Sequence, residues 1–363
     1  MRKVIKIGII LFFNLIFLVF FQNKVLAINS GEEFEYKEAR ITKISEEKMI
    51  EVMGKEQLYQ KLELEILENK KMIEVENGDL PLANIIEYSK RDMVLVNLLI
   101  NPDGNERYVI VDFIRKDSLV LLVIIFVALL LIVAKWKGLF AIFGMIFTFF
   151  VVFSFVLPQI LAGGNPILIA ILASIIIIPV SFYLAHGFNK KTTIAIIASL
   201  ISLMITIVLA SIFTKIGHLS GLSSEEAGML SLDRVNLNMK GILLAGIVVG
   251  ALGVLDDITI SQAAIVDELV SSTKLTKTKD LYVRSMVIGK DHIGSMVNTL
   301  VLAYAGAFLP LLLVFVNSPH PFVEVINYEF IAEEIIRTLV GSIGLILAVP
   351  ITSYIAARSY RDK

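Results

Sequence analysis

The sequence predicts an α-helical membrane bundle of about seven spans, preceded by a cleavable signal peptide and a small extracytoplasmic β-rich domain. Three observations support this fold class. Of the 363 residues, 56% are hydrophobic, against about 45–50% in soluble domains. After residue 118, apolar runs repeatedly reach the ~20 residues that cross a bilayer. Between residues 28 and 116, apolar and polar residues instead alternate with the period of two that is typical of β-strands.

The composition limits the partners and the chemistry. A net charge of −1 without a basic block gives no reason to expect a nucleic-acid partner. The chain has no cysteine, which excludes disulfides, thiolate metal ligands and a cysteine nucleophile. With four histidines, the sequence indicates no cofactor and leaves a metal site undetermined. The lipid bilayer is the expected partner, and a homo-oligomer or a membrane partner protein is compatible with the sequence.

Residues 1–27 have the three parts of a secretory signal. Arg2, Lys3 and Lys6 form the charged start, Ile7–Phe21 the apolar core, and residues 25–27 a cleavage site. The alternative is an uncleaved anchor. Either outcome places residue 30 outside the cytoplasm.

Residues 28–116 are expected to form an OB-like or otherwise barrel-shaped domain, because several short strands with turn residues between them are typical of such folds. The turn residues lie at 68–70 and 101–105. We interpret the domain as a folded cap or interaction module. The strand-like segments are Glu35–Ile44, Leu58–Leu67, Met72–Val75, Met93–Ile100 and Tyr108–Ile114.

The membrane domain, residues 117–363, can be oriented by its basic residues. One set of short connections holds twelve Lys and Arg residues and the opposite set holds six. Because Lys and Arg concentrate on the cytoplasmic side, we expect a cytoplasmic carboxy-terminus and an extracytoplasmic amino-terminal domain in the cell membrane, in agreement with the signal. Spans are expected near residues 118–134, 138–157, 167–185, 192–213, 241–261, 292–316 and 337–357.

Two outside loops are expected to carry short surface helices. In the segment 222–232, Ser223 and Glu226 match the S-x-x-E capping box that opens a helix. In the segment 327–337, Glu333 and Arg337 are four residues apart and can pair on one helix face.

The segment Met239–Ser272 carries the best functional signal. Its fifteen apolar or small residues Gly241–Leu255 cover roughly 22 Å of a hydrocarbon layer about 30 Å thick. A span that begins at Gly241 therefore carries Asp256 and Asp257 inside the layer, unless the helix breaks near Gly253. Ionised groups at that depth cost several kcal/mol and are usually retained for a pathway, a relay or a partner.

Small and acidic residues share one face of this segment. Asp257, Ser261 and Glu268 follow helical spacing. The residues Gly246, Gly250 and Gly253 are expected to let another helix approach closely. Asp267 and Glu268 lie near the cytoplasmic end, where solvation or a salt bridge accounts for them.

The expected facing helix begins at Lys290. Asp291, Ser295 and Asn298 again follow helical spacing, with His292 and Thr299 beside them. We expect Asp256 or Asp257 to meet Asn298, Ser295 or His292 across an antiparallel hairpin. The alternatives are an interfacial role for His292 and plain interhelical hydrogen bonding for Asn298 and Thr299.

Three motifs resemble the YibE/F-like family of integral membrane proteins. They are GALGVLDDITISQAAIVDEL at Gly250–Leu269, GKDHIGSMVNTLVLAYAGAFLPLLL at Gly289–Leu313 and EFIAEEIIRTLVGSIGLILAVPIT at Glu329–Thr352. The resemblance implies a bacterial-type multi-pass membrane protein and implies no particular reaction.

Three functions are compatible with these observations. The first is transport or ion translocation, with Asp256 and Asp257 binding a cation or relaying protons. The second is a non-catalytic membrane assembly or sensor component that acts through its outer domain. The third is a metal-dependent membrane enzyme, for which the signal is weakest: the acidic pair lacks the third acid of a DDxxD motif, Gly253–Asp256 departs from GxGD, and neither a P-loop nor G-x-S-x-G occurs.

Overall fold

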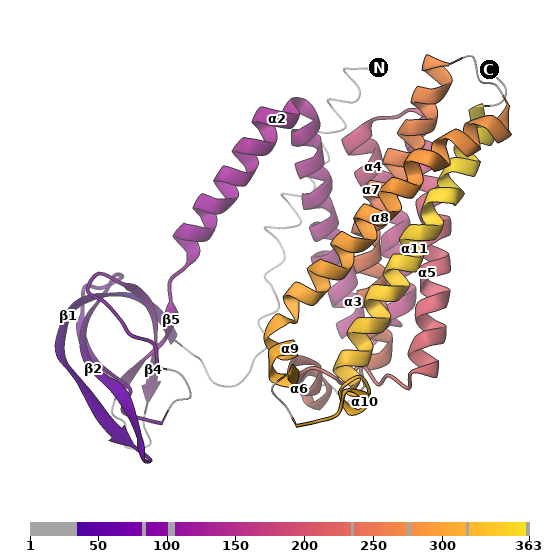
Figure 1. The fold of residues 1–363 in the computed structure, drawn as a ribbon. Helices are drawn as coiled ribbons and strands as arrows, with labels where there is room; N and C mark the ends of the chain where they lie inside the picture. The colour runs from indigo at the N-terminus through magenta and orange to yellow at the C-terminus, as the bar shows by residue number, and fades with distance from the viewer. Residues whose placement is uncertain are drawn as a thin grey trace. The chain divides into compact units, whose positions relative to one another are not determined.

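The computed structural model describes residues 35–81, 85–100, 106–233, 236–273, 277–316 and 319–360. The chain divides after Ala128 into two units, a β-sheet unit and a helical unit (Figure 1). The expected signal peptide and the expected turn at 101–105 lie outside the described residues.

The first unit contains one antiparallel sheet of five strands, at the places where the alternation predicts strands. The strand order is β3-β2-β1-β4-β5. The strands are β1 (Glu35–Val52), β2 (Lys55–Ile66), β3 (Met72–Asn77), β4 (Met93–Ile100) and β5 (Glu106–Phe113).

One face of this sheet is apolar and buried, as the period of two requires. Ile41, Leu62, Leu64 and Val96 are each fully buried in a single core. Tyr88 packs onto that core, and the buried Gln60 holds it: the Gln60 amide donates to the Tyr88 carbonyl at 3.0 Å and accepts from its N–H at 2.9 Å. The unit therefore has a core of its own.

The β1–β2 hairpin is longer than the alternation predicts. Its two strands continue to Val52 and from Lys55, joined by Met53 and Gly54 with φ of 51° and 79°. Two consecutive positive φ values are typical of the type I′ turn that closes tight hairpins. In the outer half of this hairpin neither face is consistently apolar, because Met49 and Ile50 lie among charged residues, so hydrophobic alternation gives no signal there.

The edge strands of the sheet approach each other. Lys71, next to β3, donates to the Tyr108 hydroxyl of β5 at 3.3 Å, and Arg107 pairs with Asp79 at 2.6 Å. A five-stranded sheet that curls in this way is compatible with the OB-like or barrel-like prediction.

The second unit is a helical bundle in which α5, α7 and α11 contact one another and α4 packs against α5 and α7 (Figure 1). Helix α8 packs against α7 and α11. The helices of the chain, of which α2 begins in the first unit, are α2 (Lys116–Val151), η1 (Val152–Val156), α3 (Leu157–Leu161), α4 (Pro166–His186), α5 (Lys190–Ile216), α6 (Glu225–Asp233), α7 (Met239–Ser272), α8 (Thr278–Ala307), α9 (Leu309–Val316), α10 (Phe322–Val325) and α11 (Glu329–Tyr360).

In the described part of the chain, five helices are long and apolar enough to cross a membrane, or six if the bent pair α8–α9 is one span. The first runs over Lys116–Leu161 and is 46 residues long, and it joins the two segments predicted as the first and second spans. Its backbone leaves the helical region at Lys135, with φ 52° and ψ −130°. The count of seven stays a prediction.

The distribution of side chains is that of a membrane protein. Large apolar residues such as Leu168, Ile175 and Ile201 are exposed, on a scale that soluble proteins avoid. The buried face of α5 consists largely of small and hydroxyl residues, including Ala198, Ser202 and Thr206. Because lipid is as apolar as leucine, helices in membranes associate through such close-packing residues.

Candidate functional site

A cavity of about 660 Å³ lies between helices α2, α4 and α7, and α2 lines it with residues on both sides of its break at Lys135. Its size is that of a small-molecule site, about 300–1,000 Å³. Most of the lining is apolar. The polar side chains that line it are Lys137, Thr148, Ser181, His186, Asp256, Asp257 and Ser261.

Both aspartates of α7 therefore line the same cavity, and α7 is unbroken at this point. Asp257 is exposed into the cavity and Asp256 is partly buried beside it. The Oδ1 atom of Asp256 is buried and has no hydrogen-bond partner among the described residues. A buried carboxylate oxygen without a donor is costly, which marks this position as one where an additional ligand or a proton would be stabilised.

The two hydroxyl side chains opposite the aspartates present acceptors to the cavity. The Ser181 hydroxyl donates to the Ile177 carbonyl at 2.8 Å, and the Thr148 hydroxyl donates to the Gly144 carbonyl at 3.0 Å. A hydroxyl whose proton is used in this way keeps only lone pairs for a further ligand. Together with the carboxylates, these oxygens suit a positively charged species.

Two basic groups border the same cavity. His186 is the last residue of α4 and Lys137 lies two residues after the break in α2, and both side chains are exposed. His186 is close enough to interact electrostatically with Asp257 and with Lys137. The site thus has acidic groups from α7 and basic groups at one rim.

The small and acidic face predicted for α7 is an exposed stripe. Gly246, Gly250, Gly253, Asp257 and Ser261 are all exposed. A side chain at Gly246 or Gly253 would meet nothing within 4 Å, and one at Gly250 would meet only the Tyr304 hydroxyl, at 3.6 Å. In the described chain, Gly246 and Gly253 hold no helix contact, and Gly253 lines the cavity instead.

The hairpin of α7 and α8 forms, but its two polar faces do not meet. Asp291, Ser295, Asn298 and Thr299 are exposed on α8, and His292 is partly buried. Among the described residues, α8 contributes nothing to the cavity lining, and no hydrogen bond joins its polar face to either aspartate. The reason is rotational: α7 directs the aspartates toward α4 and turns another face toward α8.

The contact between α7 and α8 uses a buried amide that the sequence analysis did not select. The Gln262 amide, fully buried, donates to the Ser285 carbonyl of α8 at 3.0 Å and to the Ser353 hydroxyl of α11 at 2.6 Å. Gly289 lies against it, since a Cβ there would be 3.0 Å from the amide nitrogen. A lone glutamine within an apolar helix was the available signal.

The remaining acids of α7 lie away from the cavity. Asp267 interacts with the hydroxyl of the buried Tyr360 at the end of α11, and Glu268 is exposed. Among the described residues, no three His, Cys, Asp or Glu side chains are grouped so as to hold a metal ion.

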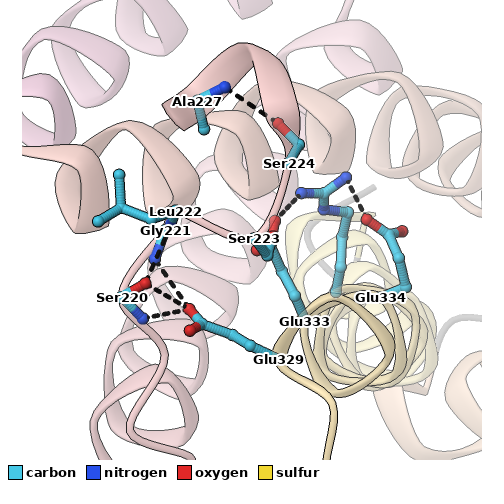
Figure 2. A network of polar contacts seen from close by, with 10 residues as sticks. Ser220, Gly221, Leu222, Ser223, Ser224, Ala227, Glu329, Glu333 and Glu334 are labelled. Atoms are coloured by element: carbon cyan, nitrogen blue, oxygen red, sulfur yellow. Dashed lines mark hydrogen bonds and ion pairs between the residues drawn. The ribbon is translucent and has the colours of Figure 1, made fainter. Parts of the chain in front are cut away.

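A second polar cluster joins the loop after α5 to the start of α11 (Figure 2). The Ser220 hydroxyl and the Gly221 N–H donate to Glu329, and the Ser223 hydroxyl donates to Glu333 at 2.5 Å. The predicted Glu333–Arg337 pair is confirmed at 2.7 Å, and Arg337 also pairs with Glu334 at 2.8 Å.

The expected capping box is displaced by one residue. The Ser224 hydroxyl accepts from the Ala227 N–H at 3.2 Å at the start of α6 (Figure 2). Ser223, predicted to cap this helix, is used by Glu333 instead. The local S-x-x-E pattern could not show that a distant carboxylate competes for its serine.

The fold and the cavity define a class of protein: a helical membrane protein with several apolar spans and a separate antiparallel β-sheet unit. The chain belongs to the YibE/F-like protein family, whose profile matches residues 122–362 and so covers nearly all of the helical unit. No curated protein and no solved structure gives a match to the chain.

Proposed function

We propose that the protein translocates a cation or protons across the cell membrane through the cavity between α2, α4 and α7. The observation that carries the proposal is the pair Asp256 and Asp257, which line this cavity from within an apolar helix. Acidic residues inside membrane spans are rare and usually mark ion or proton pathways.

The exposed stripe on α7 supports a path as well as a site. It runs from Gly246 through Asp257 to Glu268. At ~1.5 Å per residue these positions span roughly 33 Å of helix, comparable with the ~30 Å hydrocarbon layer. The cavity lies in the middle of the stripe. We assign cation or proton binding to Asp256 and Asp257. The hydroxyl oxygens of Ser261, Ser181 and Thr148 are proposed as additional ligands of the cation.

The proposed topology has seven spans. The helix Lys116–Leu161 would be roughly 69 Å long if straight, more than twice the hydrocarbon layer. Its break at Lys135 fits a turn between two spans, with Lys135 and Lys137 on the cytoplasmic side. In this proposed topology the β-sheet unit is outside, the carboxy-terminus is inside, and the cavity rim with His186 is at the cytoplasmic end.

Flux measurements in proteoliposomes test the function. The purified protein should transport a monovalent cation or protons when a gradient is applied, and Asp256→Asn and Asp257→Asn should each slow the flux at least tenfold. Asp280→Asn, an exposed carboxylate in the first turn of α8 that lies outside both the cavity lining and the α7 stripe, is the matched control and should leave the flux unchanged. Asp291→Asn should also leave the flux unchanged, because Asp291 lies on the α8 face that the sequence predicts to be part of the site and does not line the cavity. Equal flux in all four variants would refute the proposal.

A separate observation supports a second candidate, a sensor or assembly component that acts through its outer domain. The β-sheet unit has its own buried core and forms a separate compact unit. If this is its role, deletion of residues 28–116 would abolish the cellular phenotype while both aspartate variants retain it. The reverse result would favour translocation.

A further inference from the structure

We infer that α8 is the interface through which two copies of this chain associate in the membrane. The inference concerns the polar face formed by Lys290, Asp291, Ser295, Asn298 and Thr299. These side chains are exposed, whereas the packing of α8 in the described part of the chain is mainly against α7 and α11. The inference is independent of the translocation proposal, since none of these residues lines the cavity.

Lipid is a poor environment for this face. Within a candidate span, an exposed asparagine amide and a carboxylate cost several kcal/mol if hydrocarbon surrounds them. The Thr299 hydroxyl donates to the Ser295 carbonyl at 3.0 Å and is thereby satisfied. The Asn298 amide and the Asp291 carboxylate retain bonding capacity. Side chains of this kind normally face another helix or a water-filled space.

The rest of the chain offers little that could cover it. The first arm of α2 has no polar side chain between Ser118 and Lys135, and α9 has none at all. An apolar helix cannot satisfy an amide. A polar helix of matching chemistry is required, and a second α8 provides one.

The face is complementary to itself. An amide is both donor and acceptor, so Asn298 of one copy can pair with Asn298 of the other across a two-fold axis. Lys290 and Asp291 are adjacent and opposite in charge, so each lysine can meet the other copy's aspartate. Gly294, on the same face, has open space where a Cβ would be, which allows close approach of two helix backbones.

Cysteine cross-linking tests the interface directly. Because the chain has no cysteine, single-cysteine variants need no altered background. Ser295→Cys and Asn298→Cys, oxidised in native membranes, should give an adduct of twice the chain mass. Two other variants are controls and should give no adduct. They are Leu300→Cys, on the side of α8 that faces Gly341 of α11, and Ile201→Cys, 42% exposed on α5. Absence of the adduct at 295 and 298, or equal adducts at all four positions, would overturn the inference.

A charge exchange tests the pairing. Lys290→Asp and Asp291→Lys should each lower the cross-linking yield at residue 298, and the double variant should restore it. Ser295→Leu with Asn298→Leu should weaken dimerisation about tenfold, measured as the dimer fraction against the protein-to-lipid ratio. A double exchange no better than the single ones would refute self-association through this face.

One further experiment tests whether another segment of the same chain covers the polar face of α8. The segment Ile7–Phe21 contains Asn14, which could serve α8 if the segment were retained as an anchor. A disulfide within one chain between Asn14→Cys and Asn298→Cys, in place of the adduct between chains, would overturn the inference in favour of that segment.

Discussion

Arg337 is the best position at which to test the energetics of the loop cluster. It pairs with Glu333 and Glu334 at 2.7 and 2.8 Å, while its own side chain is 28% exposed and theirs are 10% and 16% exposed. Arg337→Met keeps most of the side-chain volume and leaves two largely buried carboxylates without a counter-charge. Breaking a buried pair in this way costs about 3–5 kcal/mol, and the partial exposure places the expected loss near the lower end, about 3 kcal/mol.

The loss should appear as a lower midpoint of thermal unfolding in detergent. For a unit of this size about 3 kcal/mol corresponds to roughly 6 °C or more. Arg358→Met is the matched control, because the Arg358 side chain is exposed and contacts only the Tyr354 hydroxyl, at 3.4 Å, among the contacts described. Adding Glu333→Gln and Glu334→Gln to Arg337→Met should recover most of the loss. Equal midpoints for the two arginine variants, or no recovery in the triple variant, would refute the reasoning.

Three further predictions concern other parts of the molecule. Gly344→Ala should destabilise the protein by about 1–3 kcal/mol, because its Cβ would lie 2.1 Å from the Thr206 hydroxyl oxygen; adding Thr206→Ala should recover part of the loss in the same unfolding assay. Gln262→Leu should cost about 1–2 kcal/mol through the lost interhelical hydrogen bonds, and Ser353→Ala in that background should add little, because their coupling is already lost. Hydrogen bonds from Ser45 and Lys43 hold the pKa of Glu63 below its usual value of 4.5, so its contribution is present above that pH and is lost as pH falls through the lowered pKa. Hydrogen exchange in β1 and β2, corrected for intrinsic rates, should therefore accelerate as pH drops below 4.5, and Glu63→Gln should flatten this dependence. An unchanged pH profile in Glu63→Gln would contradict the assignment.

The elements that sequence analysis located correctly are those governed by local periodicity. The β-strands around Ile41, Leu64 and Val96 follow from alternation, because every second side chain enters the core. The apolar helices follow from run length, because backbone groups in lipid must be satisfied within the helix. The outer end of the β1–β2 hairpin was missed because neither face there is consistently apolar.

Only part of the candidate site could be predicted from the sequence. Asp256 and Asp257 could be selected because the apolar run before them is too short to cross the layer. Their neighbours could not be identified, because Ser181 and Thr148 come from helices whose sequences are otherwise apolar. Hydroxyl residues in such helices most often bond their own backbone, which they also do here.

The sequence by itself determined the membrane class, the approximate helices and strands, and the acidic pair within an apolar helix. The tertiary structure decided which faces meet. Helix α7 carries polar groups on two faces, the aspartates on one and Gln262 on another. Periodicity alone does not indicate which of the two faces packs against another helix. Packing decides between the two faces. The buried Gln262 amide contacts α8 and α11, and the carboxylates lie at the cavity beside α4. The physical reason is that helix rotation depends on how all neighbours fill space together, which no single segment encodes.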